Sequence, residues 1–90
     1  DVAASEAAAA AELRALTDEA RGRLGALHEH VVVGKPADEI LRLARELAVD
    51  LIVVGSHGVD PVAHLFVGSV AERVVRGATC PVTVVRLPRA

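Results

Sequence analysis

The sequence predicts a layered α/β fold with a mostly parallel sheet. Helix-type and strand-type segments alternate along the 90 residues, which is typical of sheets covered by helices. The run Leu51 to Val54 is apolar without interruption, and this pattern indicates a strand buried on both faces. A Val-rich run from Pro81 to Arg86 predicts a further strand. Strands that are connected through helices pair in parallel, with right-handed crossovers.

The first segment is a predicted amphipathic helix from about Ser5 to Leu27. Alanines at positions 7–11 add helix propensity. Gly22 and Gly25 weaken the last turns, so the helix can end on either side of Gly25. Apolar residues recur at helical spacings of three and four, at Leu13, Leu16, Ala20, Leu24 and Leu27.

A strand and a second helix follow. The β-branched run His28 to Val33 predicts the strand, which Gly34 ends. Pro36 to Ala48 reads as a helix, because proline suits a first helical turn and the acidic residues after it favour the positive end of the helix dipole. The side chains expected to be buried are Ile40, Leu41, Ala44, Leu47 and Ala48.

The last helix is predicted to begin at Ser69. Ser69 and Glu72 have the spacing of a capping box, with Ser69 as the N-cap residue. Gly77 ends the helix before the last strand. The predicted apolar stripe consists of Val70, Ala71, Val74 and Val75.

Composition excludes several classes of function. Hydrophobic residues make up 52% and aromatic residues 1%, which indicates an aliphatic core and argues against both a disordered chain and an aromatic platform for single-stranded nucleic acid. The net charge is −2, so the chain lacks the excess of basic residues that is typical of nucleic-acid-binding proteins. The sequence has neither a membrane-spanning run nor a basic signal-peptide start. The single cysteine, Cys80, cannot form an internal disulfide, so we expect a cytoplasmic protein. From the charge and the lack of an apolar run, we expect neither nucleic acid nor a membrane as a partner.

The stretch from Val54 to Glu72 contains the strongest candidate for a binding site. It leads from the carboxyl end of a strand to the amino end of a helix, where open α/β sheets bind ligands. Glycines at positions 55, 58 and 68 let the backbone approach a phosphate, and the helix start provides free N–H groups. The Ser69 hydroxyl adds a donor. The same residues are also compatible with a purely structural role in turns and a helix cap.

The spacing of these residues resembles a known signature. Gly55, Gly58, Gly68 and Ser69 match the nucleotide-binding pattern G-x2-G-x9-G-[S/T] of the universal stress protein family. The surrounding sequence is similar too, at Asp50–Gly58, Gly68–Val75, Cys80-Pro81-Val82 and Gly34-Lys35-Pro36-Ala37. The resemblance implies one three-layer α/β/α domain over residues 1–90, Rossmann-like and of the adenine nucleotide alpha hydrolase type. It also implies a regulator of the stress response.

The resemblance further implies a ligand and a partner. The ligand is ATP or a related adenine nucleotide, with or without Mg²⁺, and the partner is a second copy that pairs through the last strand, Val82–Arg86. Enzymatic activity beyond weak ATP hydrolysis is not implied, because no general base or metal-binding carboxylates can be assigned. The expected nucleotide contacts are Gly55, Ser56, His57, Gly58, Gly68, Ser69 and Val70.

Two departures from the family pattern leave an alternative open. Val59-Asp60-Pro61 stands where the family has a basic residue and another glycine, and Asp60 places a negative charge near the expected phosphates. The family's N-terminal βαβ unit, with its adenine-side aspartate, is expected to be missing, which leaves a gap in the centre of the sheet. The alternative is a module of the same fold that does not bind nucleotide and acts in dimerisation or protein interaction.

Other candidate residues have simpler explanations. His28 and His30 share a face of the predicted strand, yet two ligands rarely hold a metal, so solvated positions are expected. His57 and His64 have no partner pattern for catalysis. Neither a nucleophile elbow nor a Walker A loop is present. Cys80 is expected to be a small buried hydrophobic residue.

Overall fold

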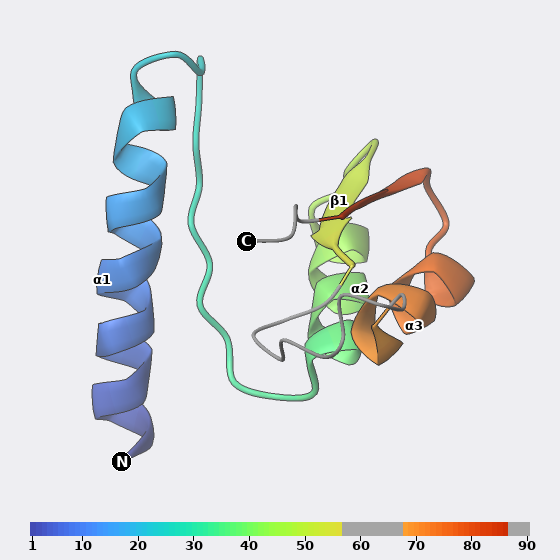
Figure 1. Cartoon of the computed structure of the whole chain (residues 1–90), viewed down its shortest axis with the longest axis horizontal. Coiled ribbons are helices and arrows are strands. Elements are labelled where there is room, and N and C mark those ends of the chain that lie inside the picture. Colours follow the sequence, from blue (N-terminus) through green and yellow to red (C-terminus); the bar gives the residue numbers. More distant parts are fainter. Residues whose placement is uncertain (57–67, 87–90) are drawn as a thin grey trace. The chain divides into compact units, whose positions relative to one another are not determined.

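The computed structural model describes residues 1–56 and 68–86 (Figure 1). The elements in chain order are α1 (Val2–Arg21), α2 (Pro36–Glu46), β1 (Ile52–Gly55), α3 (Ser69–Gly77) and β2 (Val82–Val85). The chain divides into two compact units, Asp1–Val33 and Gly34–Ala90. The expectation of a single domain over residues 1–90 stays a prediction.

The first unit consists of α1 and an extended segment. α1 begins at Val2, because the side chain of Asp1 caps it by accepting a hydrogen bond from the Ala4 N–H at 2.8 Å. It ends at Arg21, before both glycines, so the end predicted near Gly25 is too late. The helix buries none of its residues, and Leu16 is 80% exposed. The predicted apolar stripe therefore packs against no core within this unit.

The strand predicted from His28 to Val33 is wrong. The segment has no strand assignment, and within the first unit no other segment is a strand with which it could pair. Side chains connect the segment to α1 instead: Glu29 accepts hydrogen bonds from Thr17 and from Arg21, the latter at 2.9 Å. β-branched residues favour extended backbone, but a strand also needs a neighbouring strand for its N–H and C=O groups.

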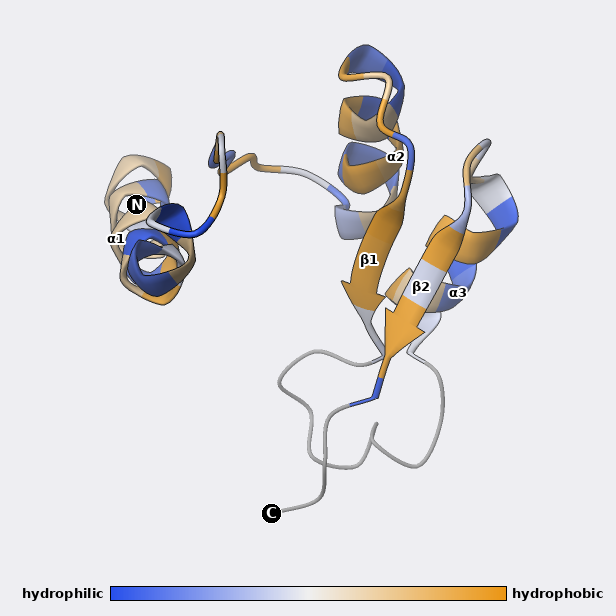
Figure 2. Cartoon of the chain, turned by 90° about the horizontal axis from the view of Figure 1, so that it is seen from above, coloured by the Kyte–Doolittle hydropathy of each residue, from blue (hydrophilic) through white to orange (hydrophobic). Residues whose placement is uncertain are grey.

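The second unit contains a parallel pair of strands. Ile52 lies opposite Val82, and Gly55 lies opposite Val85. The chain passes from β1 to β2 through α3, so the predicted strand–helix–strand order with parallel pairing is confirmed (Figure 1). Figure 2 shows the two strands side by side, both predominantly hydrophobic.

Helices α2 and α3 cover one face of this pair. Ala37 of α2, Ile52 of β1 and Val74 of α3 form the buried centre, with 2%, 8% and 0% of their surface exposed. Residues of the opposite face are open, and Val53 is 59% exposed. The prediction that β1 is buried on both faces is therefore wrong for the described residues: the apolar run is continuous, but helices cover one of its two faces.

The end of α2 is set by a tight backbone turn. Ala48 has a positive φ of 50°, its N–H bonds to the carbonyl of Arg45 at 3.2 Å, and the Val49 N–H bonds to the carbonyl of Ala44 at 3.1 Å. This is the Schellman arrangement, which ends a helix and satisfies its last carbonyl groups. The predicted helix end at Ala48 is therefore two residues too late. Leu47 is 54% exposed and Ala48 is exposed, so their predicted burial is wrong.

Replacing Ala48 with glycine is expected to stabilise the protein. A residue with a Cβ in the left-handed region destabilises the folded state by roughly 1–2 kcal/mol relative to glycine. Glycine also gives the unfolded chain more conformational freedom, which offsets roughly half of the stability gained by the substitution. We expect Ala48→Gly to raise the free energy of unfolding in urea by about 0.5–1 kcal/mol. Ala48→Val, which is β-branched, should lower it. A glycine variant less stable than the parent would contradict this assignment of the helix end.

Candidate functional site

The carboxyl end of β1 and the amino end of α3 meet at one edge of the sheet. The Ser56 N–H donates to the carbonyl of Val85 at 2.8 Å, which extends the pairing of the two strands by one step. The Gly68 N–H donates to the carbonyl of Ser56. These bonds bring Gly55 and Ser56 next to Gly68 and Ser69. His57 and Gly58 lie outside the described residues, as do Asp60, Pro61 and His64.

The cap of α3 differs from the predicted capping box. Gly68 is the N-cap residue, because its carbonyl accepts the first helical bond from the Glu72 N–H at 3.0 Å. Ser69 is the first helical residue, and no side chain caps the helix. The predicted N-cap role of Ser69 is therefore wrong. Glu72 forms an ion pair with Arg76 at 2.6 Å.

This shift leaves the Ser69 side chain exposed at the start of the helix. The first N–H groups of a helix have no carbonyl four residues back to bind. Ser69 and Val70 are exposed, whereas Ala71 is buried at 1%. The amides of Ser56 and Gly68 already donate within the turn. The candidate donors at this helix start are therefore the amides of Ser69 and Val70, which belong to the first turn, and the hydroxyl of Ser69.

Among the residues that the structure describes, the charged side chains of α3 form ion pairs. Arg76 pairs with Glu72, the acidic residue of the first turn, and Arg73 pairs with Asp38 of α2 at 3.3 Å. A balanced Glu72 opposes an incoming anion less than a free carboxylate does. The donors themselves are N–H and O–H groups at a positive helix end, which suits an anion.

Metal-binding geometry is absent from the residues that the structure describes. Within residues 1–56 and 68–86, no three His, Cys, Asp or Glu side chains gather in a way that would hold a metal ion. His28 and His30 are exposed and lie outside any strand. Within the same residues, no helix has both the length and the apolar character needed to cross a membrane.

A sequence profile of the Universal stress protein family matches residues 1–86. The chain belongs to this family. Membership confirms the resemblance drawn from the glycine spacing, and it implies a Rossmann-like α/β fold. The helices and the small parallel sheet of the second unit agree with that fold class.

Individual members of the universal stress protein family are clearly similar to this chain. Universal stress protein MJ0531 of Methanocaldococcus jannaschii is 43% identical over 63 residues, which cover 70% of this chain and 37% of the relative. Universal stress protein YxiE of Bacillus subtilis is 49% identical over 53 residues, covering 59% and 36%. The chain thus spans little more than a third of the length of these relatives. No solved structure matches it significantly.

The position of Ser69 leads to a stability prediction. Removing a hydroxyl that caps a helix costs about 1 kcal/mol. Because Ser69 is the first helical residue and does not cap, we expect Ser69→Ala to change the free energy of unfolding by less than about 0.5 kcal/mol. Urea denaturation measures this value. As a control, Asp1→Ala removes an observed cap and should reduce the helix content of α1 in circular dichroism. If Ser69→Ala lowered the free energy of unfolding by about 1 kcal/mol, Ser69 would be the N-cap residue after all, as in a capping box.

Proposed function

We propose that this universal stress protein binds ATP or a related adenine nucleotide and acts as a regulator in the stress response. The observation that carries the proposal is the hydrogen bond from the Gly68 N–H to the Ser56 carbonyl. It holds the open amino end of α3 against the carboxyl end of β1, where ligands of α/β sheets bind. The cytoplasmic location expected from the single Cys80 is part of the proposal.

The phosphates would bind at the start of α3. The amides of Ser69 and Val70 and the Ser69 hydroxyl would donate to phosphate oxygens, while Gly55, Ser56 and Gly68 shape the turn. His57 and Gly58 complete the proposed set from the family signature. ATP that carries Mg²⁺ supplies ligands to the ion through its own phosphates and water, so no protein carboxylate cluster is required.

Magnitudes predict weak binding by these donors alone. Three charge-assisted hydrogen bonds contribute roughly 5–9 kcal/mol, and association costs an estimated 4 kcal/mol or more. The net value of at most about 5 kcal/mol corresponds to a Kd no tighter than about 0.2 mM, whereas a micromolar Kd needs about 8 kcal/mol. Tighter binding would therefore need contacts to the adenosine half of the nucleotide in addition to these donors. The family profile matches from residue 1 onward, so the expectation that the family's N-terminal unit is missing is not supported.

A nuclear magnetic resonance titration of the ¹⁵N-labelled chain with ATP tests the proposal. We expect the amide signals of Ser69 and Val70 to move with a Kd of about a millimolar. Ser69→Ala should weaken binding about tenfold, because it removes one charge-assisted donor and leaves the fold intact. Ser5→Ala removes a hydroxyl from α1 and serves as the matched control.

Gly68→Val adds bulk at the approach to the helix start and should abolish the response. Tripolyphosphate and adenosine, titrated separately, show which half of the nucleotide is bound. Signals of Ser69 and Val70 that stay in place up to about 10 mM ATP, well above the expected Kd, would exclude the nucleotide site.

A second candidate function is a dimerisation module of the same fold. β2 pairs with β1 on one side, and within the described residues no strand pairs with its other edge. Val85 on β2 is 43% exposed. An open strand edge with apolar side chains favours pairing with another strand, and two copies of β2 related by a two-fold axis would satisfy both edges.

Sedimentation equilibrium tests the dimer. We expect a mass of twice 9.3 kDa at high concentration. Val85→Lys should raise the dissociation constant at least about tenfold, because lysine on an edge strand opposes pairing. Val53→Lys places the same charge on β1 and is the control. A parent protein that stays monomeric at all concentrations would exclude this function.

A further inference from the structure

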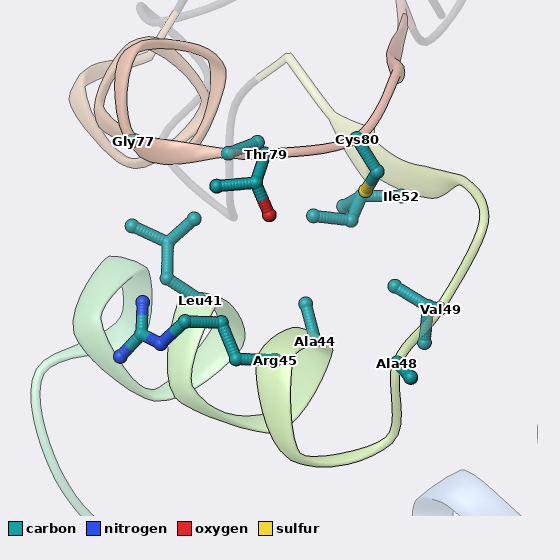
Figure 3. Close-up of a pocket in the computed structure, with 10 residues that line it drawn as sticks. Leu41, Ala44, Arg45, Ala48, Val49, Ile52, Gly77, Thr79 and Cys80 are labelled. Carbon is teal, nitrogen blue, oxygen red and sulfur yellow. The ribbon is translucent and has the colours of Figure 1, made fainter.

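A hollow of about 230 Å³ lies at the other pole of the sheet (Figure 3). It opens where the carboxyl ends of α2 and α3 meet the amino ends of β1 and β2. The glycine turn is at the opposite end of the same strands, so the two places are distinct. The walls come from all four elements of the second unit or from the residues that flank them.

Aliphatic side chains form two sides of the hollow, and polar groups make up a comparable share of its exposed lining. Leu41 and Ala44 of α2 form one side, and Ile52, Val49 and the sulfur of Cys80 form the other (Figure 3). A dry aliphatic cavity of about 150 Å³ is large enough to bind benzene. This hollow therefore has room for a six-membered ring or a short alkyl chain with a small polar substituent.

Two polar side chains line the hollow from opposite walls. The Thr79 hydroxyl points into it from the segment after α3, and the Arg45 side chain runs outward from α2, so that its guanidinium lies at the outer edge beside Leu41 (Figure 3). The other arginines of α2 and α3 are engaged: Arg42 pairs with Glu39 at 2.7 Å, and Arg73 and Arg76 also have carboxylate partners. Arg45 forms no ion pair within the part of the chain that the structure describes.

The helix ends at this pole oppose an anion only slightly. Carboxyl ends of helices carry partial negative charge, which arises from unbonded carbonyl groups. At the end of α2 the carbonyls of Ala44 and Arg45 already accept bonds from Val49 and Ala48, and at the end of α3 the Ala78 N–H bonds to Val74 at 2.9 Å. The full charge of the Arg45 guanidinium, which binds carboxylates with two N–H groups, is the stronger effect.

We propose that this hollow binds a small apolar monocarboxylate, an aromatic or short aliphatic acid. The hydrocarbon part would fill the space between Leu41, Ala44 and Ile52. The carboxylate would pair with Arg45 and accept a hydrogen bond from the Thr79 hydroxyl. This ligand differs in class from a nucleotide, and its site shares no residue with the glycine turn.

Titration of the ¹⁵N-labelled chain with benzoate tests the proposal. We expect the amide signals of Ala48, Thr79 and Cys80 to move with a Kd of about a millimolar, as for other fragments of this size, while those of Ser69 and Val70 stay in place. Cys80 is the single cysteine, so benzoate should also slow its alkylation by iodoacetamide. Benzyl alcohol, which has the ring without the charge, should bind about tenfold more weakly.

Two variants test separately the charge of Arg45 and the volume of the hollow. Arg45→Gln should weaken benzoate binding about tenfold, and Arg76→Gln, with the same loss of charge on α3, should not. Ala44→Leu fills the hollow and should abolish the benzoate response without changing the ATP response at Ser69. The proposal is overturned if benzoate moves no signal near Thr79 up to about 20 mM, or if benzyl alcohol and benzoate bind equally well.

Discussion

The second unit depends on the packing of two helices against one face of a two-stranded sheet. Strands of four residues in a single parallel pair are not stable in water by themselves, since they need a covered apolar face. Ala37, Ile52 and Val74 supply that cover, and their small or branched side chains let α2 and α3 approach the strands closely. Residues 1–56 and 68–86 contain no Phe, Tyr or Trp side chain, so aliphatic side chains form the buried core that the structure describes.

This packing also creates two chemically different poles. Parallel pairing places both carboxyl ends of the strands at one edge, where the Ser56 N–H reaches Val85 and the Gly68 N–H reaches Ser56. The amino end of α3 therefore lies at the carboxyl end of β1, held there by the bond between Gly68 and Ser56. At the other pole, small residues such as Ala44 and Ala78 leave a hollow between the helices and the strands.

Local patterns predicted the elements of the second unit well. The helix from Pro36 was predicted to within two residues at its end, and the last helix and strand to within one residue at each end. Proline at a helix start and glycine at a helix end act through adjacent backbone, so their effect is readable from the sequence. The error at the start of α3 is of the same local kind: Gly68 and Ser69 are both good N-cap residues, and the sequence does not rank them.

By itself, the sequence determined the family, the order of helices and strands in the second unit, and the glycine spacing of the candidate site. These depend on residue type and periodicity. Only the tertiary structure decided which face of β1 is covered, whether residues 28–33 form a strand, and which donors stay accessible at α3. Each of these depends on a partner distant in sequence: a strand needs a neighbour for its backbone, and an apolar face is buried only where another element packs on it.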